Sequence, residues 1–162
     1  MTEYFSNLSE QDYSKLKDAI PLITLLIGGA DGDLDQNEKA WAEKVTKIRA
    51  YKMSEDLIGF YREVGVDYQE RLEHFIESLS TEVDKRTSEI SSLLEELNPI
   101  LSTIDETVAY HLYKSYKSFA KHVAKASGGL FGFFSIGPEE KALLGLPMLD
   151  PISKPEGYDE EE

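Results

Sequence analysis

The sequence predicts an all-α protein with about seven helices packed around one core. Apolar residues recur at intervals of three and four along most of the chain, and no stretch shows sustained period-two alternation. Capping and turn residues separate segments of helical length. We therefore expect a single compact helical domain over residues 1–149, followed by a flexible acidic tail over residues 150–162.

The composition narrows the functional classes. The 162 residues carry a formal net charge of −14, from 31 acidic and 17 basic side chains, which opposes general binding to nucleic acid or anionic membranes. The chain has no cysteine, which excludes disulfides, thiolate metal sites and cysteine nucleophiles. No signal peptide is visible, and the apolar run over residues 20–30 is too short to span a bilayer. We expect a soluble, cytoplasmic protein.

The first part of the chain predicts two helices. Ser9 is a typical helix N-cap, and the apolar positions after it recur with helical spacing. Pro21 either kinks this helix or opens a second one at its first turn. Gly28 and Gly29 are expected to end it before an acidic segment. The next helix is expected over about residues 36–51.

Capping signals predict three helices in the middle of the chain. Ser54 precedes two acidic residues and an apolar stripe, so it is expected to begin a helix. Asp67 is expected to cap the following helix. A charged, serine-rich helix is expected over residues 81–97, with Pro99 marking its end.

The longest predicted helix begins at a capping box, Thr-Ile-Asp-Glu over residues 103–106, and runs to about Ala126. One side of it carries a basic stripe, which is expected to be a solvated face or to pair with the acidic helix that contains Glu89, Glu95 and Glu96. Docking of an acidic ligand or phosphate is the alternative. The stripe comprises Lys114, Lys117, Lys121 and Lys125. The histidines are scattered and show no zinc-binding or di-iron spacing; they are His74, His111 and His122.

Candidate metal-binding chemistry is concentrated in residues 30–38. Like charges this close repel one another unless a cation, helix N–H groups or water takes up the charge, and carboxylate oxygens suit Ca²⁺ or Mg²⁺. An EF-hand loop starting at Asp31 requires glycine and glutamate where this chain has Gln36 and Ala42, so that loop type does not fit. The carboxylates are Asp31, Asp33, Asp35 and Glu38.

A metal-free interpretation of this segment remains open. Asp35 is a good N-cap, and Glu38 stands three residues later, so the two complete a capping box. The dipole of the following helix would then stabilise the negative charge without a cation.

The order Ala30-Asp31-Gly32, then Leu34-Asp35, then Glu38 at a helix start resembles the Ala-Asp-Gly…Glu signature of the tellurite-resistance TerB-like family. Members are all-helical, acidic, cytosolic bacterial proteins. The resemblance implies a non-catalytic module that binds a divalent cation, Ca²⁺ or Mg²⁺, in a stress-response or membrane-associated assembly. Asp31, Asp35 and Glu38 match the family's acidic positions, and Asp33 is an additional carboxylate.

A second short stretch echoes the acidic segment. Ala-Ser-Gly over residues 126–128 and Glu-Lys-Ala over residues 140–142 correspond to Ala-Asp-Gly over residues 30–32 and Glu-Lys-Ala over residues 38–40. TerB-like proteins resemble two related helical halves, so the echo is consistent with that family. Glu140 is then the expected carboxylate of the second half, beside Glu139.

Three phenylalanines stand in a predicted glycine-bearing loop over residues 130–136. Phe131, Phe133 and Phe134 either fold back over the core or form an exposed patch that docks a partner. This patch defines the alternative function, a metal-free helical scaffold or adaptor. We expect a protein partner, but neither a nucleic acid nor a small-molecule substrate. The family resemblance also implies peripheral association with a membrane protein complex. No catalytic constellation is evident, so we expect no enzyme activity.

Overall fold

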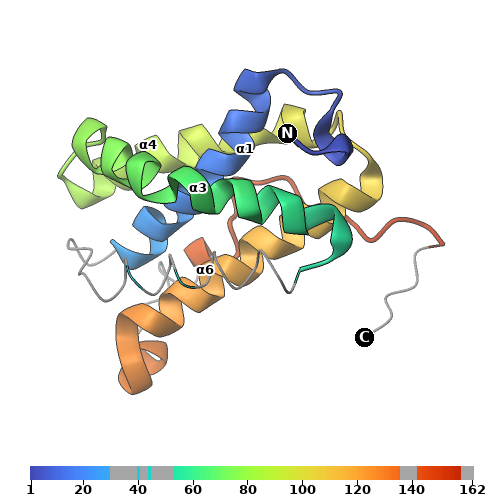
Figure 1. Cartoon of the computed structure of the whole chain (residues 1–162). Helices are drawn as coiled ribbons and strands as arrows, with labels where there is room; N and C mark the ends of the chain where they lie inside the picture. Colours follow the sequence, from blue (N-terminus) through green and yellow to red (C-terminus); the bar gives the residue numbers. More distant parts are fainter. Residues whose placement is uncertain (30–39, 41–43, 45–52, 136–141, 158–162) are drawn as a thin grey trace.

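The computed structural model describes residues 1–29, 40, 44, 53–135 and 142–157; for residues 126–135 it describes the backbone alone. This part of the chain is helical and contains no strand, which confirms the all-α class (Figure 1). The predicted helix over residues 36–51 lies almost wholly outside it, so the total of seven helices stays a prediction. The α-helices are α1 (Glu10–Ile23), α3 (Glu55–Ser78), α4 (Val83–Glu95), α5 (Leu97–Leu101) and α6 (Glu106–Ser135).

Helix α1 begins where its cap predicts. The Ser9 hydroxyl accepts a hydrogen bond from the Asp12 backbone N–H at 3.1 Å, which satisfies one of the donors at the helix start. Pro21 lies inside α1, and a π-helical turn, η2 (Thr24–Gly28), follows without a break. The proline therefore neither ends the helix nor opens a separate α-helix. It removes one N–H from the ladder just before the chain widens into the π-turn.

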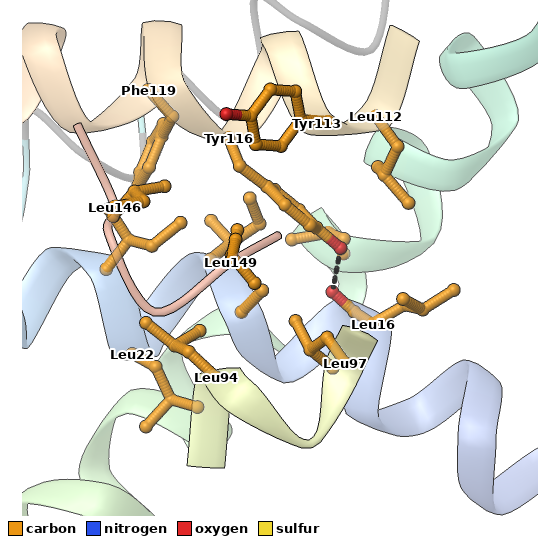
Figure 2. Close-up of a cluster of buried hydrophobic side chains, with 14 of the residues drawn as sticks. Leu16, Leu22, Leu94, Leu97, Leu112, Tyr113, Tyr116, Phe119, Leu146 and Leu149 are labelled. Atoms are coloured by element: carbon orange, nitrogen blue, oxygen red, sulfur yellow. Dashed lines mark hydrogen bonds between the residues drawn. The ribbon is translucent and has the colours of Figure 1, made fainter. Parts of the chain in front are cut away.

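The core is centred on α1 and η2, which pack against α3 and α6 (Figure 1). Figure 2 shows one part of this core, where leucines of α1, α4 and α5 meet the aromatic rings of α6. The buried Tyr116 hydroxyl donates a hydrogen bond to the Leu16 carbonyl oxygen at 2.7 Å, joining α6 to α1. Leu146 and Leu149, which follow α6 in sequence, are buried in the same cluster.

The segment after Leu149 is attached through Asn98 on α5. The Asn98 side-chain amide donates to the Met148 carbonyl at 3.0 Å, and its oxygen accepts from the Asp150 N–H at 2.9 Å. Residues 150–157 beyond this pair are exposed or half-buried.

Two predicted helices are joined in α3. The predicted N-cap, Asp67, instead lies within a continuous helical element as a single non-helical residue with φ −126° and ψ 20°. The kink places its carboxylate 2.9 Å from Nε of Arg71, whose Nη1 lies 2.5 Å from Oδ1 of Asp18 on α1. The pattern correctly indicates a break at this residue, but the chain bends there rather than stopping.

Two predicted boundaries near α5 and α6 are wrong. Pro99 does not end a helix; it occupies the first turn of α5, where the missing N–H costs no hydrogen bond. Thr103 does not cap α6, because its hydroxyl donates to the Ile100 carbonyl oxygen at 2.7 Å. Asp105 caps the helix instead, accepting from the N–H groups of Thr107 and Val108 at 3.1 and 3.3 Å.

Candidate functional site

The predicted metal ligands lie outside the described residues. They are Asp31, Asp33, Asp35, Glu38 and Glu140. The structure does describe how the chain approaches the acidic segment. Turn η2 ends at Gly28, and Gly29 is the last described residue before it.

Gly29 is fixed by a side chain from another helix. Nη2 of Arg86 on α4 donates a hydrogen bond to the Gly29 carbonyl oxygen at 2.7 Å. A Cβ atom at Gly29 would lie 2.6 Å from the Leu25 carbonyl oxygen and 3.0 Å from Arg86 Nη2. Only glycine permits this close approach, so the chain leaves the core at a defined point immediately before the carboxylates.

The π-turn itself is held from inside the core. Thr24 is 0% exposed, and its hydroxyl donates to the Ile20 carbonyl oxygen at 2.9 Å. The hydroxyl of Tyr68 on α3 lies 2.9 Å from the same Thr24 oxygen. Since the single Thr24 proton is directed at Ile20, Tyr68 donates to Thr24. Both hydroxyls are thereby paired in a buried position.

The predicted phenylalanine loop is helical in the structure. Helix α6 continues through Ser135, so residues 130–135 are not a loop, and Ile136 lies outside the described residues. Glycine weakens a helix interior by only about 1 kcal/mol and keeps its N–H donor, so Gly128, Gly129 and Gly132 do not stop the helix. Phe131, Phe133 and Phe134 stand on the last turns of α6. Their side chains lie outside the described part of the structure, so the two predicted outcomes, burial in the core or an exposed patch, stay predictions.

Sequence reasoning missed a pair formed by a buried carboxylate and a half-buried imidazole. Asp56, in the first turn of α3, is only 8% exposed, and its Oδ2 lies 2.6 Å from Nδ1 of His111 on α6. Its Oδ1 accepts a hydrogen bond from the Ser54 hydroxyl at 2.5 Å. The partners are 55 residues apart. The only signal in the sequence was a histidine close to the apolar seam of a long helix.

A small pocket of about 250 Å³ lies beside this pair. It is lined by Met53, Ser54, Leu57, His111, Lys114, Ser115 and Ser118. A larger hollow of about 600 Å³ lies between α5, the start of α6 and residues 150–156. The smaller pocket is the one that adjoins the Asp56–His111 pair.

No group of three or more histidine, aspartate or glutamate side chains is placed to share a metal ion among the residues that the structure covers. Within the same ranges, no helix combines the length and apolar character needed to cross a membrane.

Comparison of the chain with protein families, curated proteins and solved structures finds no match. The helices identify the chain as a protein of the all-α class. The resemblance to the TerB-like family rests on the short acidic motif.

Proposed function

We propose that this protein is a non-catalytic, TerB-like module that binds a divalent cation, Ca²⁺ or Mg²⁺, through the acidic segment at residues 30–38. The observation that supports it is the fixed position of Gly29, which Arg86 and the buried π-turn hold directly ahead of the four carboxylates. By the same resemblance, the module acts in the cytoplasm within a stress-response or membrane-associated assembly.

The chemistry of the segment suits a hard cation. Asp31, Asp33, Asp35 and Glu38 supply carboxylate oxygens, and a Ca²⁺ shell takes six to eight oxygens in total. Backbone carbonyls, water or Glu140 would provide the remainder. The net charge of −14 adds a general attraction for cations.

Anchoring of Gly29 reduces the entropic cost of binding. A loop loses conformational freedom when it closes around an ion, and each residue fixed beforehand removes part of that loss. The Arg86 hydrogen bond and the Thr24–Tyr68 contact fix the entry to the segment before any ion arrives.

The lone tryptophan provides the test. Trp41 stands three residues after Glu38, so its emission should respond to ordering of the segment. The protein is stripped with a chelator and titrated separately with Ca²⁺ and Mg²⁺ while Trp41 fluorescence and Tm are followed. We expect a saturable change and a higher Tm, with a stabilisation of about 2.7 kcal/mol at one hundred times Kd.

A charge-matched pair of variants makes the test specific. Asp31→Asn with Glu38→Gln should abolish the cation-dependent stabilisation. Asp84→Asn with Glu95→Gln removes the same charge from exposed positions on α4 and should preserve it. The proposal fails if millimolar ion changes neither signal, or if the first double variant responds as the unmodified protein does.

The alternative function is a metal-free helical adaptor that binds a protein through Phe131, Phe133 and Phe134. The observation that favours it is the extension of α6 through Ser135, which carries these residues to the far end of the longest helix (Figure 1). Phe133→Ser with Phe134→Ser should leave the helical circular dichroism and Tm unchanged while a partner is lost from a pull-down. A loss of folding would instead identify the rings as core.

A further inference from the structure

We propose that the pocket beside Asp56 and His111 binds a small oxyanion, namely phosphate or the phosphate group of a phosphomonoester. This site is formed by α3 and α6, and the proposal does not depend on cation binding by the acidic segment.

One wall of the pocket is a single face of α6. Lys114 and Ser115 stand three and four residues after His111, and Ser118 stands three residues after Ser115, which places all four on one side of the helix. The opposite wall comprises Met53, Ser54 and Leu57 at the start of α3. The pocket thus brings together an ammonium, an imidazole and the Ser118 hydroxyl, groups that can donate hydrogen bonds to phosphate oxygens. The hydroxyl protons of Ser54 and Ser115 are directed at Asp56 Oδ1 and at the Leu112 carbonyl oxygen.

Asp56 organises the wall rather than acting as a ligand. Its Oδ2 forms a hydrogen bond with Nδ1 of His111 at 2.6 Å, and its Oδ1 accepts a hydrogen bond from the Ser54 hydroxyl at 2.5 Å. Both carboxylate oxygens therefore have a partner within the protein. A carboxylate at Nδ1 fixes the orientation of the imidazole ring. An oxyanion at the pocket would select the imidazolium form, in which both ring nitrogens donate.

Basic side chains are concentrated on α6, the helix that forms this wall, although the chain as a whole is acidic. Nζ of Lys114 lies over the Tyr110 ring, 5.2 Å from its centroid, and Nζ of Lys117 lies 5.3 Å from the centroid of Tyr113. These lysines belong to the basic stripe of α6, which continues to Lys121 and Lys125. A row of ammonium groups along one helix supplies the potential that steers an anion toward the pocket.

A metal cation suits this pocket less well. The Lys114 ammonium at its rim repels cations, and no group of three potential ligands occurs in the part of the chain that the structure describes. The volume of about 250 Å³ lies just below the range of about 300–1,000 Å³ that is typical of sites for larger organic ligands. Phosphate with a small substituent is the class of ligand that fits.

The test follows the ring signals of His111 by NMR, assigned by their loss in His111→Gln. Sodium phosphate is added at constant pH and ionic strength, with chloride as the balancing anion. We expect the chemical shifts of the His111 ring to change with phosphate concentration and to reach a plateau, which gives the Kd for phosphate. Lys114→Met should weaken binding at least tenfold, while Lys121→Met, an exposed lysine of the same stripe outside the pocket, should change it less than twofold.

Two further arms complete the design. Glycerol phosphate replaces inorganic phosphate; tighter binding identifies a phosphomonoester as the ligand, and equal affinity identifies free phosphate. Ser118→Asp places a carboxylate in the pocket and should abolish binding while the circular dichroism is unchanged. The proposal is overturned by a shift that does not saturate, by equal losses in Lys114→Met and Lys121→Met, or by a response to Zn²⁺ or Ca²⁺ with none to phosphate.

Discussion

Arg86 on α4 donates a hydrogen bond from its guanidinium to the carbonyl oxygen of Gly29, across 57 residues of sequence and a distance of 2.7 Å. The bond joins α4 to the end of the π-turn and sets the point at which the chain leaves the core. A charged donor at a main-chain carbonyl forms a stronger bond than a neutral one. It also connects the described helices directly to the segment for which we propose cation binding.

Replacement of Arg86 should therefore affect stability first. We expect Arg86→Gln to lower the free energy of unfolding by about 1.5–3 kcal/mol, the range for hydrogen bonds to charged groups. Urea denaturation measures the change. Lys85→Gln, an exposed neighbour on the same helix, removes the same charge and should be nearly neutral. If cation binding is confirmed, Arg86→Gln should also weaken it, because the entry to the segment would no longer be fixed.

The close approach at Gly29 leads to a second prediction. Gly29→Ala brings a methyl group to 2.6 Å from the Leu25 carbonyl oxygen and 3.0 Å from Arg86 Nη2, so the backbone or the guanidinium must move. We expect a loss of about 1–3 kcal/mol in the free energy of unfolding, as for other overpacked sites. Gly145→Ala is the matched control, since its nearest contact would be 3.6 Å from the Ala142 carbonyl oxygen. Equal effects of the two substitutions would contradict the steric argument.

The buried contact between Thr24 and Tyr68 leads to a third prediction. Thr24→Val keeps the shape of the side chain but leaves the Tyr68 hydroxyl without the acceptor it has at 2.9 Å. We expect destabilisation by about 0.5–1.5 kcal/mol in chemical denaturation, the net contribution of a typical intramolecular hydrogen bond. Combining it with Tyr68→Phe removes both partners, so the double variant should lose less stability than the sum of the single losses. Strict additivity would show that the two hydroxyls do not interact.

Sequence reasoning succeeded where the deciding interaction is local. The Ser9 hydroxyl reaches the N–H of Asp12 only three residues away, so the residue types alone indicate the start of α1. For α6 the sequence predicts the wrong N-cap residue, although the signal there is also local. Thr103 and Asp105 are both good N-caps, and the preference of the Thr103 hydroxyl for the Ile100 carbonyl decides between them.

The features that position candidate sites could not be predicted in this way. Asp56 and His111 are 55 residues apart, and Arg86 and Gly29 are 57 apart. Neither pair has a spacing rule, because each depends on how α3, α4 and α6 pack around α1 and η2. The sequence could identify the acidic segment as a cluster of carboxylates, whereas the pocket beside His111 required the fold.

The pH dependence of stability provides the fourth prediction, through Glu63 on α3. Burial raises the pKa of Glu63, but hydrogen bonds from the Met1 ammonium, at 2.6 Å, and from the Tyr13 hydroxyl outweigh it, so the pKa is lowered from its ordinary value of 4.5. The unfolded chain therefore takes up this proton first as the pH falls. The stability that Glu63 contributes is complete above about pH 4.5 and is lost as the pH falls through the folded-state pKa.

Glu63→Gln isolates this contribution from those of the other carboxylates. Its free energy of unfolding should lie below that of the unmodified protein at neutral pH, and the gap should narrow as the pH falls below about 4.5. Urea denaturation at a series of pH values from 7 to about 3 measures the gap. Glu77→Gln, at an exposed position of the same helix, serves as the control and should show a small gap with little pH dependence. A gap for Glu63→Gln that stays constant or widens in acid would mean that Met1 and Tyr13 do not stabilise the ionised carboxylate.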